Sequence, residues 1–390
     1  MSHEIHVSER RSFRGCRRRW NWAYREGFVP ETPIKALEFG VAYHKALECF
    51  YHPVSWDAPS AVKTERAVEE FTLECTKQKT NYLTAMHVRS LPDEVEQDYD
   101  ERLELGRGML KYHGDFVHPK FDSWFKPVAV EIPFEVPIED PDRPGVPLKC
   151  LNSPQCGQGH SNDPNDSDSD VVYAGRVDML VEDLRYGGYF IWDHKTAAAL
   201  AKDDGFLQLD DQVGSYAWAL RYVLGLDVRG FIYAESRKDF PREPKELKRL
   251  SGGRSFSTAQ NQATSLEIFE PFVAKHDRLA YESGAYDEYI AWLKSAEATQ
   301  FHQRFVIIKS AAELRNIGKN ISLEAADMVD SRTRIYPSVG RYTCSTCAFR
   351  QPCLNEFMDE DTRYLLESTY VQTDRRYWME APMSSEKGTK

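Results

Sequence analysis

Two aspartates and a lysine form the pattern with the clearest chemical meaning in this sequence. Asp178 stands in the apolar run VVYAGRVDMLVE, and Asp193 and Lys195 end the run YFIWDHKT. Two carboxylates brought together repel each other unless a divalent cation lies between them, and oxygen ligands suit Mg²⁺ or Mn²⁺. A nearby lysine can hold a water molecule or a phosphate oxygen beside that cation. One interpretation is therefore a catalytic metal site, and the other is a set of ordinary solvated charges at strand ends.

Hydrophobic periodicity predicts the elements that must position these residues. Alternation with a period of two residues is typical of strands, and apolar residues three and four apart are typical of helices. The predicted strands are 127–136, 171–182, 189–196 and 228–236, and the predicted helices are 36–51, 60–86, 93–117 and 206–224. Alternation along the third strand places Asp193 and Lys195 on one face and His194 on the other.

The order of these elements predicts an α/β core with a mixed sheet. The first three strands can form a meander, because the Gly187-Gly188 pair favours a tight hairpin, and the fourth strand follows a helical crossover. The segment from about 265 to 330 is expected to be mostly helical. The expected regions are a helical region 1–97, the core 98–236 with a loop insertion 140–170, a basic loop 237–264, a helical region 265–380 and a tail 381–390.

The composition limits the classes of function. The chain has 390 residues, of which 41% are hydrophobic and 12% aromatic, so it can build a large core and is not a disordered polyelectrolyte. The net charge of −11 is an average, because Glu9–Arg25 holds seven Arg against one Glu and 237–262 holds seven Lys and Arg against three acids. These segments are either solvated or bind a DNA backbone without reading sequence. The candidate contacts are Arg17, Arg18, Arg19, Arg237, Lys238, Lys245, Lys248, Arg249 and Arg254.

The sequence contains eight cysteines, and the cellular compartment of the protein decides whether they form disulfides. The first residues form no apolar signal segment, and no run of about 18 apolar residues predicts a membrane span. A reducing cytoplasm is therefore expected, where clustered cysteines favour metal binding over disulfides. Cys150, Cys156 and His160 lie in the loop insertion, where loop composition explains them better than a zinc site with three visible ligands.

A compact cysteine cluster lies near the end of the chain. Cys344, Cys347 and Cys353 are spaced C-x2-C-x5-C, and Cys16 lies far upstream in the run CRRRWNWAY. Three clustered thiolates need a fourth ligand to complete a Cys₄ site. Ligand type alone leaves zinc and an iron–sulfur cluster as alternatives.

The first motif resembles a known family. GRVD at 175–178 followed by WDHKT at 192–196 resembles motifs II and III of the PD-(D/E)xK nuclease superfamily. Asp193 stands where many relatives have Glu, and both residues occur in the superfamily pattern. The resemblance implies a restriction-endonuclease-like core with a mixed central sheet, in the order α-βββ-α-β.

The resemblance also implies roles for the motif residues. Asp178 and Asp193 would ligate Mg²⁺ or Mn²⁺, together with the backbone carbonyl of His194. Lys195 would orient or help to deprotonate the attacking water and would stabilise the charge that develops on the phosphate.

Further motif residues resemble the RecB-like branch of that superfamily. Gln212 and Tyr216 match its Q-x-x-x-Y motif and would position the substrate or the core. Gly40 to His44 matches its G-x-x-x-H motif, which makes His44 a further metal ligand. Glu131, on the preceding strand, is a candidate extra carboxylate, and its alternative is a solvent-facing strand residue.

The cysteine spacing resembles the iron–sulfur subset of RecB-like nucleases. These include CRISPR-associated RecB-like exonucleases and the DNA-end-processing subunits of helicase–nucleases. The resemblance implies a 4Fe–4S cluster on Cys16, Cys344, Cys347 and Cys353 that joins the helical N- and C-terminal regions. It favours iron–sulfur over zinc at this site.

Three functional hypotheses follow. The first is a metal-dependent DNA exonuclease that acts at ends or on single strands, in phage or bacterial recombination, repair or CRISPR adaptation. It would work in the cytoplasm of a bacterial or phage-infected cell, and since the chain has no P-loop motif, a helicase, recombinase or CRISPR integrase would be a separate partner. The second is a non-catalytic iron–sulfur DNA-binding protein with a nuclease-like fold. The third is a zinc-stapled scaffold protein.

Overall fold

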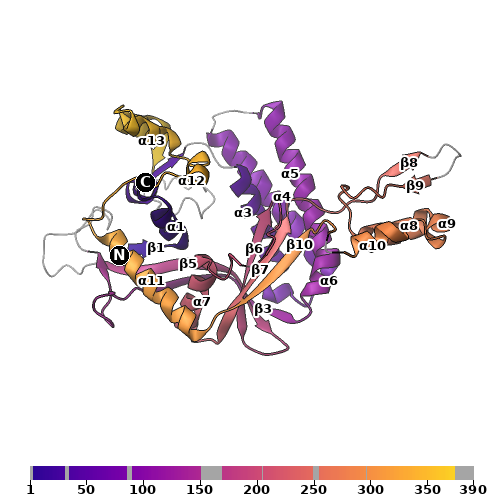
Figure 1. Cartoon of the computed structure of the whole chain (residues 1–390), viewed down its shortest axis with the longest axis horizontal. Helices are drawn as coiled ribbons and strands as arrows, with labels where there is room; N and C mark the ends of the chain where they lie inside the picture. Colours follow the sequence, from indigo (N-terminus) through magenta and orange to yellow (C-terminus); the bar gives the residue numbers. More distant parts are fainter. Residues whose placement is uncertain are drawn as a thin grey trace.

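A mixed sheet forms the centre of the protein (Figure 1). The computed structural model describes residues 3–30, 35–85, 90–150, 169–203, 205–248, 254–295 and 297–373. Within these ranges the sheet contains β1 (His3–Ile5), β3 (Phe125–Pro137), β4 (Lys149–Cys150), β5 (Ser169–Asp183), β6 (Tyr189–Ala197), β7 (Val228–Arg237) and β10 (His302–Ile308). The strand order is β1-β5-β6-β7-β10, and β3 and β4 also pair with β5.

The predicted meander and crossover are confirmed. β5 pairs antiparallel with both β3 and β6, whereas β6 pairs parallel with β7. Gly187 and Gly188 make the β5–β6 turn with φ of 66° and 81°, a backbone region that favours glycine. The crossover helix α7 (Asp211–Leu224) begins later than predicted, because Asp210 caps its N-terminus, and it ends at Gly225 with a φ of 62°.

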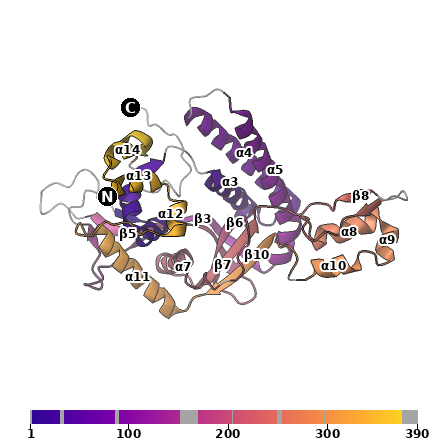
Figure 2. The ribbon, with the colours of Figure 1, turned by 45° about the horizontal axis from the view of Figure 1, so that its top comes forward.

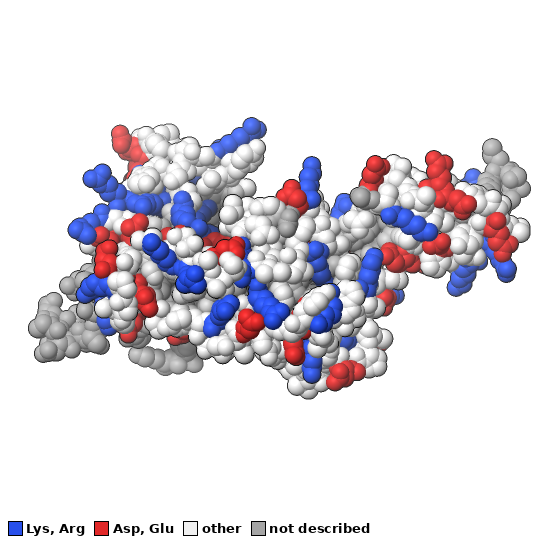
Figure 3. Space-filling view, turned by 60° about the horizontal axis from the view of Figure 1, so that its bottom comes forward, with Lys and Arg blue, Asp and Glu red and all other residues white. Residues whose placement is uncertain are grey.

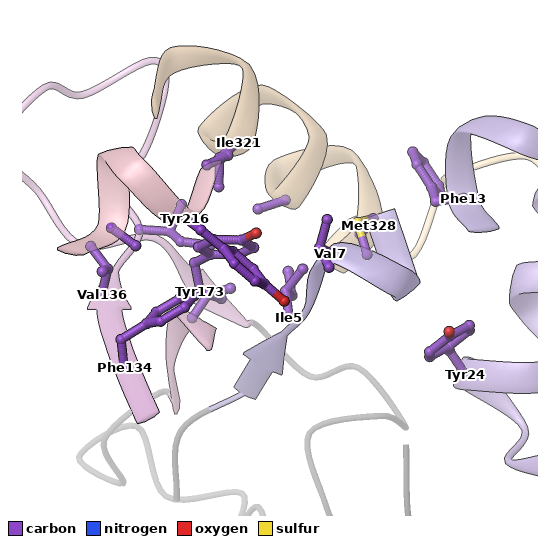
Figure 4. Packing of buried hydrophobic residues seen from close by; sticks show 14 of the residues in the cluster. Ile5, Val7, Phe13, Tyr24, Phe134, Val136, Tyr173, Tyr216, Ile321 and Met328 are labelled. Carbon is purple, nitrogen blue, oxygen red and sulfur yellow. The ribbon is translucent and has the colours of Figure 1, made fainter. Parts of the chain in front are cut away.

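Helices cover both faces of the sheet. One face is covered by α3 (Lys35–Phe50), α4 (Ser60–Ala85) and α5 (Asp93–Tyr112). The short helix η2 (Pro53–Ser55) links α3 to α4, and the short helices η3 (His113–Val117) and α6 (His118–Phe121) follow α5. The other face is covered by α7 and α11 (Ala311–Val329). Each face has its own hydrophobic core, which we call the α3 core and the α7 core after the helices that cover them. Trp192 packs into the α3 core and its neighbour Ile191 into the α7 core, because successive side chains of a strand point to opposite faces. Figure 4 shows part of the core on the α7 side, where the rings of Tyr173 and Tyr216 both pack against Phe134.

The two ends of the described chain form one lobe (Figure 2). Its short strands β2 (Phe28–Pro30) and β11 (Tyr370–Gln372) pair antiparallel. Its helices are α1 (Val7–Gly15), α2 (Arg17–Trp20), η1 (Asn21–Arg25), α12 (Arg341–Ser345), α13 (Arg350–Phe357) and α14 (Thr362–Thr369). The predicted tail 381–390 lies outside the described residues.

A projecting arm lies at the opposite end of the molecule (Figures 1 and 2). It contains the hairpin strands β8 (Glu246–Lys248) and β9 (Arg254–Phe256) and the helices α8 (Leu266–His276), α9 (Arg278–Glu282) and α10 (Asp287–Leu293). The arm has a small core of its own, which includes Phe256, Phe269 and Tyr289. Part of the predicted basic loop is therefore an ordered hairpin. None of the described helices is long and apolar enough to cross a membrane.

Two strands of the sheet come from outside the predicted core segment. β1 pairs parallel with β5, and β10 pairs antiparallel with β7 at the sheet edge. β10 lies in the segment that was expected to be mostly helical. Val306 and Ile308 are exposed on β10 and Ile307 is buried, so this strand presents little of the apolar alternation that predicts strands.

Candidate active site

A small pocket opens beside the end of the β5–β6 ladder. Its volume is about 10 Å³, which is room for a single water-sized sphere. The polar side chains that line it are His44, Glu48, Tyr51, Glu131, Asp178 and His194. They come from α3, the residue directly after it, β3, β5 and β6, so only the folded sheet and the helix on it bring these residues together.

The divergence of two strands creates this site. The β5–β6 ladder runs from the pair Glu182 and Tyr189 to the pair Met179 and Trp192, where the pairing ends. Asp178 comes next on β5 at this opening. Its carboxylate Oδ2 accepts a hydrogen bond from the backbone N–H of His194 at 3.1 Å and lies 3.4 Å from Nδ1 of His44.

Asp193 is buried on the other side of the same opening. Its Oδ2 lies 2.6 Å from Nζ of Lys195, and its Oδ1 accepts a hydrogen bond of 3.3 Å from Nε2 of Gln212. Burial raises the pKa of Asp193, Lys195 opposes the rise, and the carboxylate of Asp178 adds to it. Burial would lower the pKa of Lys195, but the attraction of both carboxylates raises it, so the ammonium is the stable form.

The donor types at this opening suit a hard divalent cation. Asp178 and Asp193 supply carboxylate oxygens whose mutual repulsion a cation would relieve, and His44 supplies an imidazole beside Asp178. No group of three or more His, Cys, Asp or Glu side chains arranged to hold a metal occurs among the described residues. The chemistry of the donors fits Mg²⁺ or Mn²⁺, although they do not form a ready-made cage.

His194 and Tyr216 lie away from the Asp193–Lys195 pair. The ring of His194 stacks on Tyr51 with centroids 5.3 Å apart, on the face opposite Asp193, as the alternation predicts. Tyr216 packs edge-on against Phe134 at 5.3 Å in the α7 core. Tyr216 therefore packs in the hydrophobic core, and its role in positioning the substrate or the core stays a prediction.

Glu131 has an unusual backbone. Its φ is 50°, although it lies within β3, where its neighbours Val130 and Ile132 pair with Met179 and Val177 on β5 and Glu131 is skipped in the register. The side chain lines the pocket and lies 3.2 Å from Arg176 and 3.9 Å from Lys45. A left-handed glutamate in a strand is strained, and such strain gathers at functional sites. Burial raises the pKa of Glu131.

A buried polar network lies behind the pocket. The hydroxyl of Tyr51 donates to Oδ2 of Asp122 at 2.6 Å, and Nδ1 of His118 lies 2.7 Å from the same oxygen. Arg304, from β10, pairs with Oδ1 of Asp122 at 2.5 Å and lies over the ring of Trp192. Sequence reasoning missed this network, because its members come from distant parts of the chain and no local pattern links them.

The network predicts a pH-dependent stability. Burial lowers the pKa of His113, whose Nε2 lies 2.8 Å from the Tyr51 hydroxyl, from its usual 6.5 to about 3. Between these two values the unfolded chain binds a proton that the folded chain does not. The free energy of unfolding should therefore fall as pH falls from 6.5 towards 3, by about 1.4 kcal/mol per pH unit for this proton. Urea unfolding at several pH values measures the slope, and His113→Gln should reduce it. An equal slope in both proteins would contradict the prediction.

The structure brings the four predicted cluster cysteines into one neighbourhood. Cys16 lies between α1 and α2, Cys344 lies in α12, Cys347 follows α12, and Cys353 lies in α13. Burial raises the pKa of Cys347, and the nearby thiols of Cys16 and Cys344 add to the rise. Burial likewise raises the pKa of Cys353, with Cys16 again contributing. None of the four is joined by a disulfide, and among the described residues their thiols are not arranged as a ready-made metal-binding group.

The cysteines of the loop insertion are only partly described. Cys150 ends β4 and is buried against the main core. Cys156 and His160 lie outside the described residues.

The arginines predicted to contact DNA are engaged within the protein. Arg17 lies 3.8 Å from Asp327, Arg18 lies 2.9 Å from Glu356, and Nε of Arg19 donates to Oγ of Ser12 at 3.2 Å. Figure 3 shows Lys and Arg interspersed with Asp and Glu over one face, and both signs on the arm. DNA contact by these arginines stays a prediction.

The second predicted DNA-contact group lies at the base of the arm and on its hairpin. Arg237 ends β7 and Lys238 follows it, near the ring of Phe39. Lys245 and Lys248 are exposed at the hairpin. Arg249 lies outside the described residues, and Arg254 begins β9.

Comparison with known families decides the class of the protein. The family model of the PD-(D/E)XK nuclease superfamily matches residues 5–354. The chain belongs to this superfamily. The match runs from β1 to α13, so it includes the sheet, the candidate active site and all four clustered cysteines. A search of curated proteins finds no match. Members of the superfamily are generally nucleases that use divalent cations, which supports an enzymatic role for this chain.

Proposed function

We propose that this chain is a metal-dependent DNA exonuclease of the RecB-like branch. The observation that carries the proposal is the meeting of Asp178, Asp193 and Lys195 where β5 and β6 diverge, in a chain that belongs to a nuclease superfamily. Gln212 contacts Asp193 and His44 contacts Asp178, and these two contacts support the RecB-like assignment.

The geometry gives each residue a task. Asp178 and Asp193 would hold Mg²⁺ or Mn²⁺, with His44 at the side of Asp178. When bound, the cation polarises the phosphate and activates a water molecule. The ammonium of Lys195 stabilises the negative charge that grows on the phosphate oxygens. The Gln212 amide and the His194 backbone N–H fix the orientations of the two carboxylates.

The clustered cysteines support a second part of the proposal. Cys16, Cys344, Cys347 and Cys353 would hold a 4Fe–4S cluster that fastens the two ends of the chain. Support comes from the nearness of Cys16 to Cys347 and Cys353, and from the β2–β11 pairing in the same lobe. The alternative occupant is zinc, and metal analysis separates the two.

The proposed substrate is DNA, bound with little sequence preference and cut at ends or on single strands. The proposed settings are phage or bacterial recombination, repair or CRISPR adaptation, in the cytoplasm of a bacterial or phage-infected cell. A helicase, a recombinase or a CRISPR integrase is the proposed separate partner.

A digestion experiment tests the proposed activity. Linear single- and double-stranded DNA labelled at either end, and closed circular DNA of the same sequence, are incubated with Mg²⁺, Mn²⁺ or a chelator. Linear DNA should be shortened only when a cation is present, and the circles should survive. Equal cutting of the circles would replace exonuclease by endonuclease. Binding without any cleavage would favour a non-catalytic iron–sulfur DNA-binding protein.

A further inference from the structure

We propose that a row of arginines on α1 is a positioning device that holds the start of α7 and, through Gln212, the catalytic carboxylate of Asp193. The row consists of Arg10, Arg11 and Arg14. It would tie the lobe formed by the two ends of the described chain, which holds the four clustered cysteines (the cysteine lobe), to the active site. The inference rests on the proposed nuclease function, because it concerns residues that support the same site.

The innermost arginine is completely enclosed. Arg10 has 0% exposure, its Nε lies 2.8 Å from Glu324 on α11, and its NH1 lies 3.0 Å from Asp211 on α7. A buried guanidinium is tolerated only when it is paired, and loss of one partner leaves an uncompensated charge. Arg10 therefore holds α1, α7 and α11 in one fixed arrangement.

The other two arginines hold the cap of α7. Arg14 lies 2.9 Å from Asp211, and Arg11 lies 2.9 Å from Asp210. Asp210 is also the N-cap, since its side chain accepts hydrogen bonds from the backbone N–H groups of Gln212 and Val213. The arginines consequently fix the two residues that orient the first turn of α7.

The next residue along α7 contacts the site. Gln212 directly follows Asp211, and its Nε2 donates to Oδ1 of Asp193 at 3.3 Å. That distance is near the limit for an N–H···O hydrogen bond, so a small shift of the first turn breaks it. Because Cys16 is the C-cap of α1, the same helix carries both the proposed cluster ligand and the row of arginines.

A double-mutant cycle tests this assignment. The variants are Arg14→Gln, Gln212→Ala and the double variant. Arg14 is chosen because its side chain is 41% exposed, so its replacement does not disturb the buried charge of Arg10 on the same helix. We measure kcat and KM on linear DNA, Mn²⁺ affinity by calorimetry and the melting temperature. If Arg14 acts through Gln212, Arg14→Gln lowers kcat about threefold or more with KM unchanged, and has no further effect in the Gln212→Ala background.

The control is Arg332→Gln, which breaks another arginine–aspartate pair, with Asp330, on the surface after α11. It should leave kcat and Mn²⁺ affinity unchanged. Multiplicative effects in the cycle, or a lower melting temperature with normal kcat, would overturn the assignment. A wild-type protein without nuclease activity would reject the proposed function instead. In that case the double-mutant cycle is evaluated from the Mn²⁺ affinities of the variants. The effects of Arg14→Gln and Gln212→Ala on the binding free energy should again be non-additive, and additive effects would overturn the role proposed for the arginine row.

Discussion

Lys195→Met is expected to reduce DNA cleavage by about 10²- to 10³-fold, as does loss of a comparable charge-stabilising donor in other enzymes. The physical reason is that Nζ of Lys195 is the positive group beside the carboxylate pair, 2.6 Å from Asp193. Its removal also leaves the buried Asp193 unpaired, so the pKa of Asp193 should rise further. Asp193→Asn should reduce cleavage by at least as much, because it removes a proposed metal ligand.

The measurement is the initial rate on end-labelled linear DNA with Mg²⁺ or Mn²⁺, together with circular dichroism to show that the variants are folded. Lys126→Met is the matched control, because Lys126 is an exposed lysine on β3 of the same sheet. It should cleave at the wild-type rate. Folded Lys195→Met or Asp193→Asn protein that retains normal cleavage would remove these residues from the proposed site.

Cys347→Ser is expected to abolish the iron–sulfur cluster and to destabilise the protein strongly. A cross-link between Cys16 and the Cys344–Cys353 segment constrains the unfolded chain over most of its length. By comparison with covalent cross-links that close long loops, its loss should lower the free energy of unfolding by about 3–5 kcal/mol. Protein purified without oxygen should be brown with a broad band near ~400 nm, as expected for cysteine-ligated clusters. The variant should lack this band and melt at a lower temperature.

The control for the cluster is Cys49→Ser. Cys49 is a half-buried thiol on α3, outside the lobe that holds the four clustered cysteines, and its loss should leave colour and iron content unchanged. Iron and sulfide analysis of the purified protein decides the outcome. Zinc alone in stoichiometric amount would replace the cluster by a Cys₄ zinc site, and a metal-free, fully stable protein would contradict both.

The sequence by itself determined the local elements and the motif residues. Strong apolar periodicity predicted the helix at 36–51 and the strands at 127–136 and 189–196, and the structure has α3, β3 and β6 there. The period of the apolar residues and the turn residues are enough to predict such elements, because the direction of each side chain follows directly from the backbone geometry of a helix or strand. The same alternation correctly separated His194 from Asp193 and Lys195.

Only the tertiary structure decided which strands share the sheet and which charges are paired. β1 and β10 join it from either side of the predicted core segment 98–236, and pairing between distant segments leaves no local period in a sequence. Arg10 reads in the sequence as one more surface arginine of a basic segment, yet it is completely buried against Asp211 and Glu324. The burial of an arginine depends on where its partners lie after folding. The structure thus places in internal ion pairs several charges that, in the sequence, pointed to DNA.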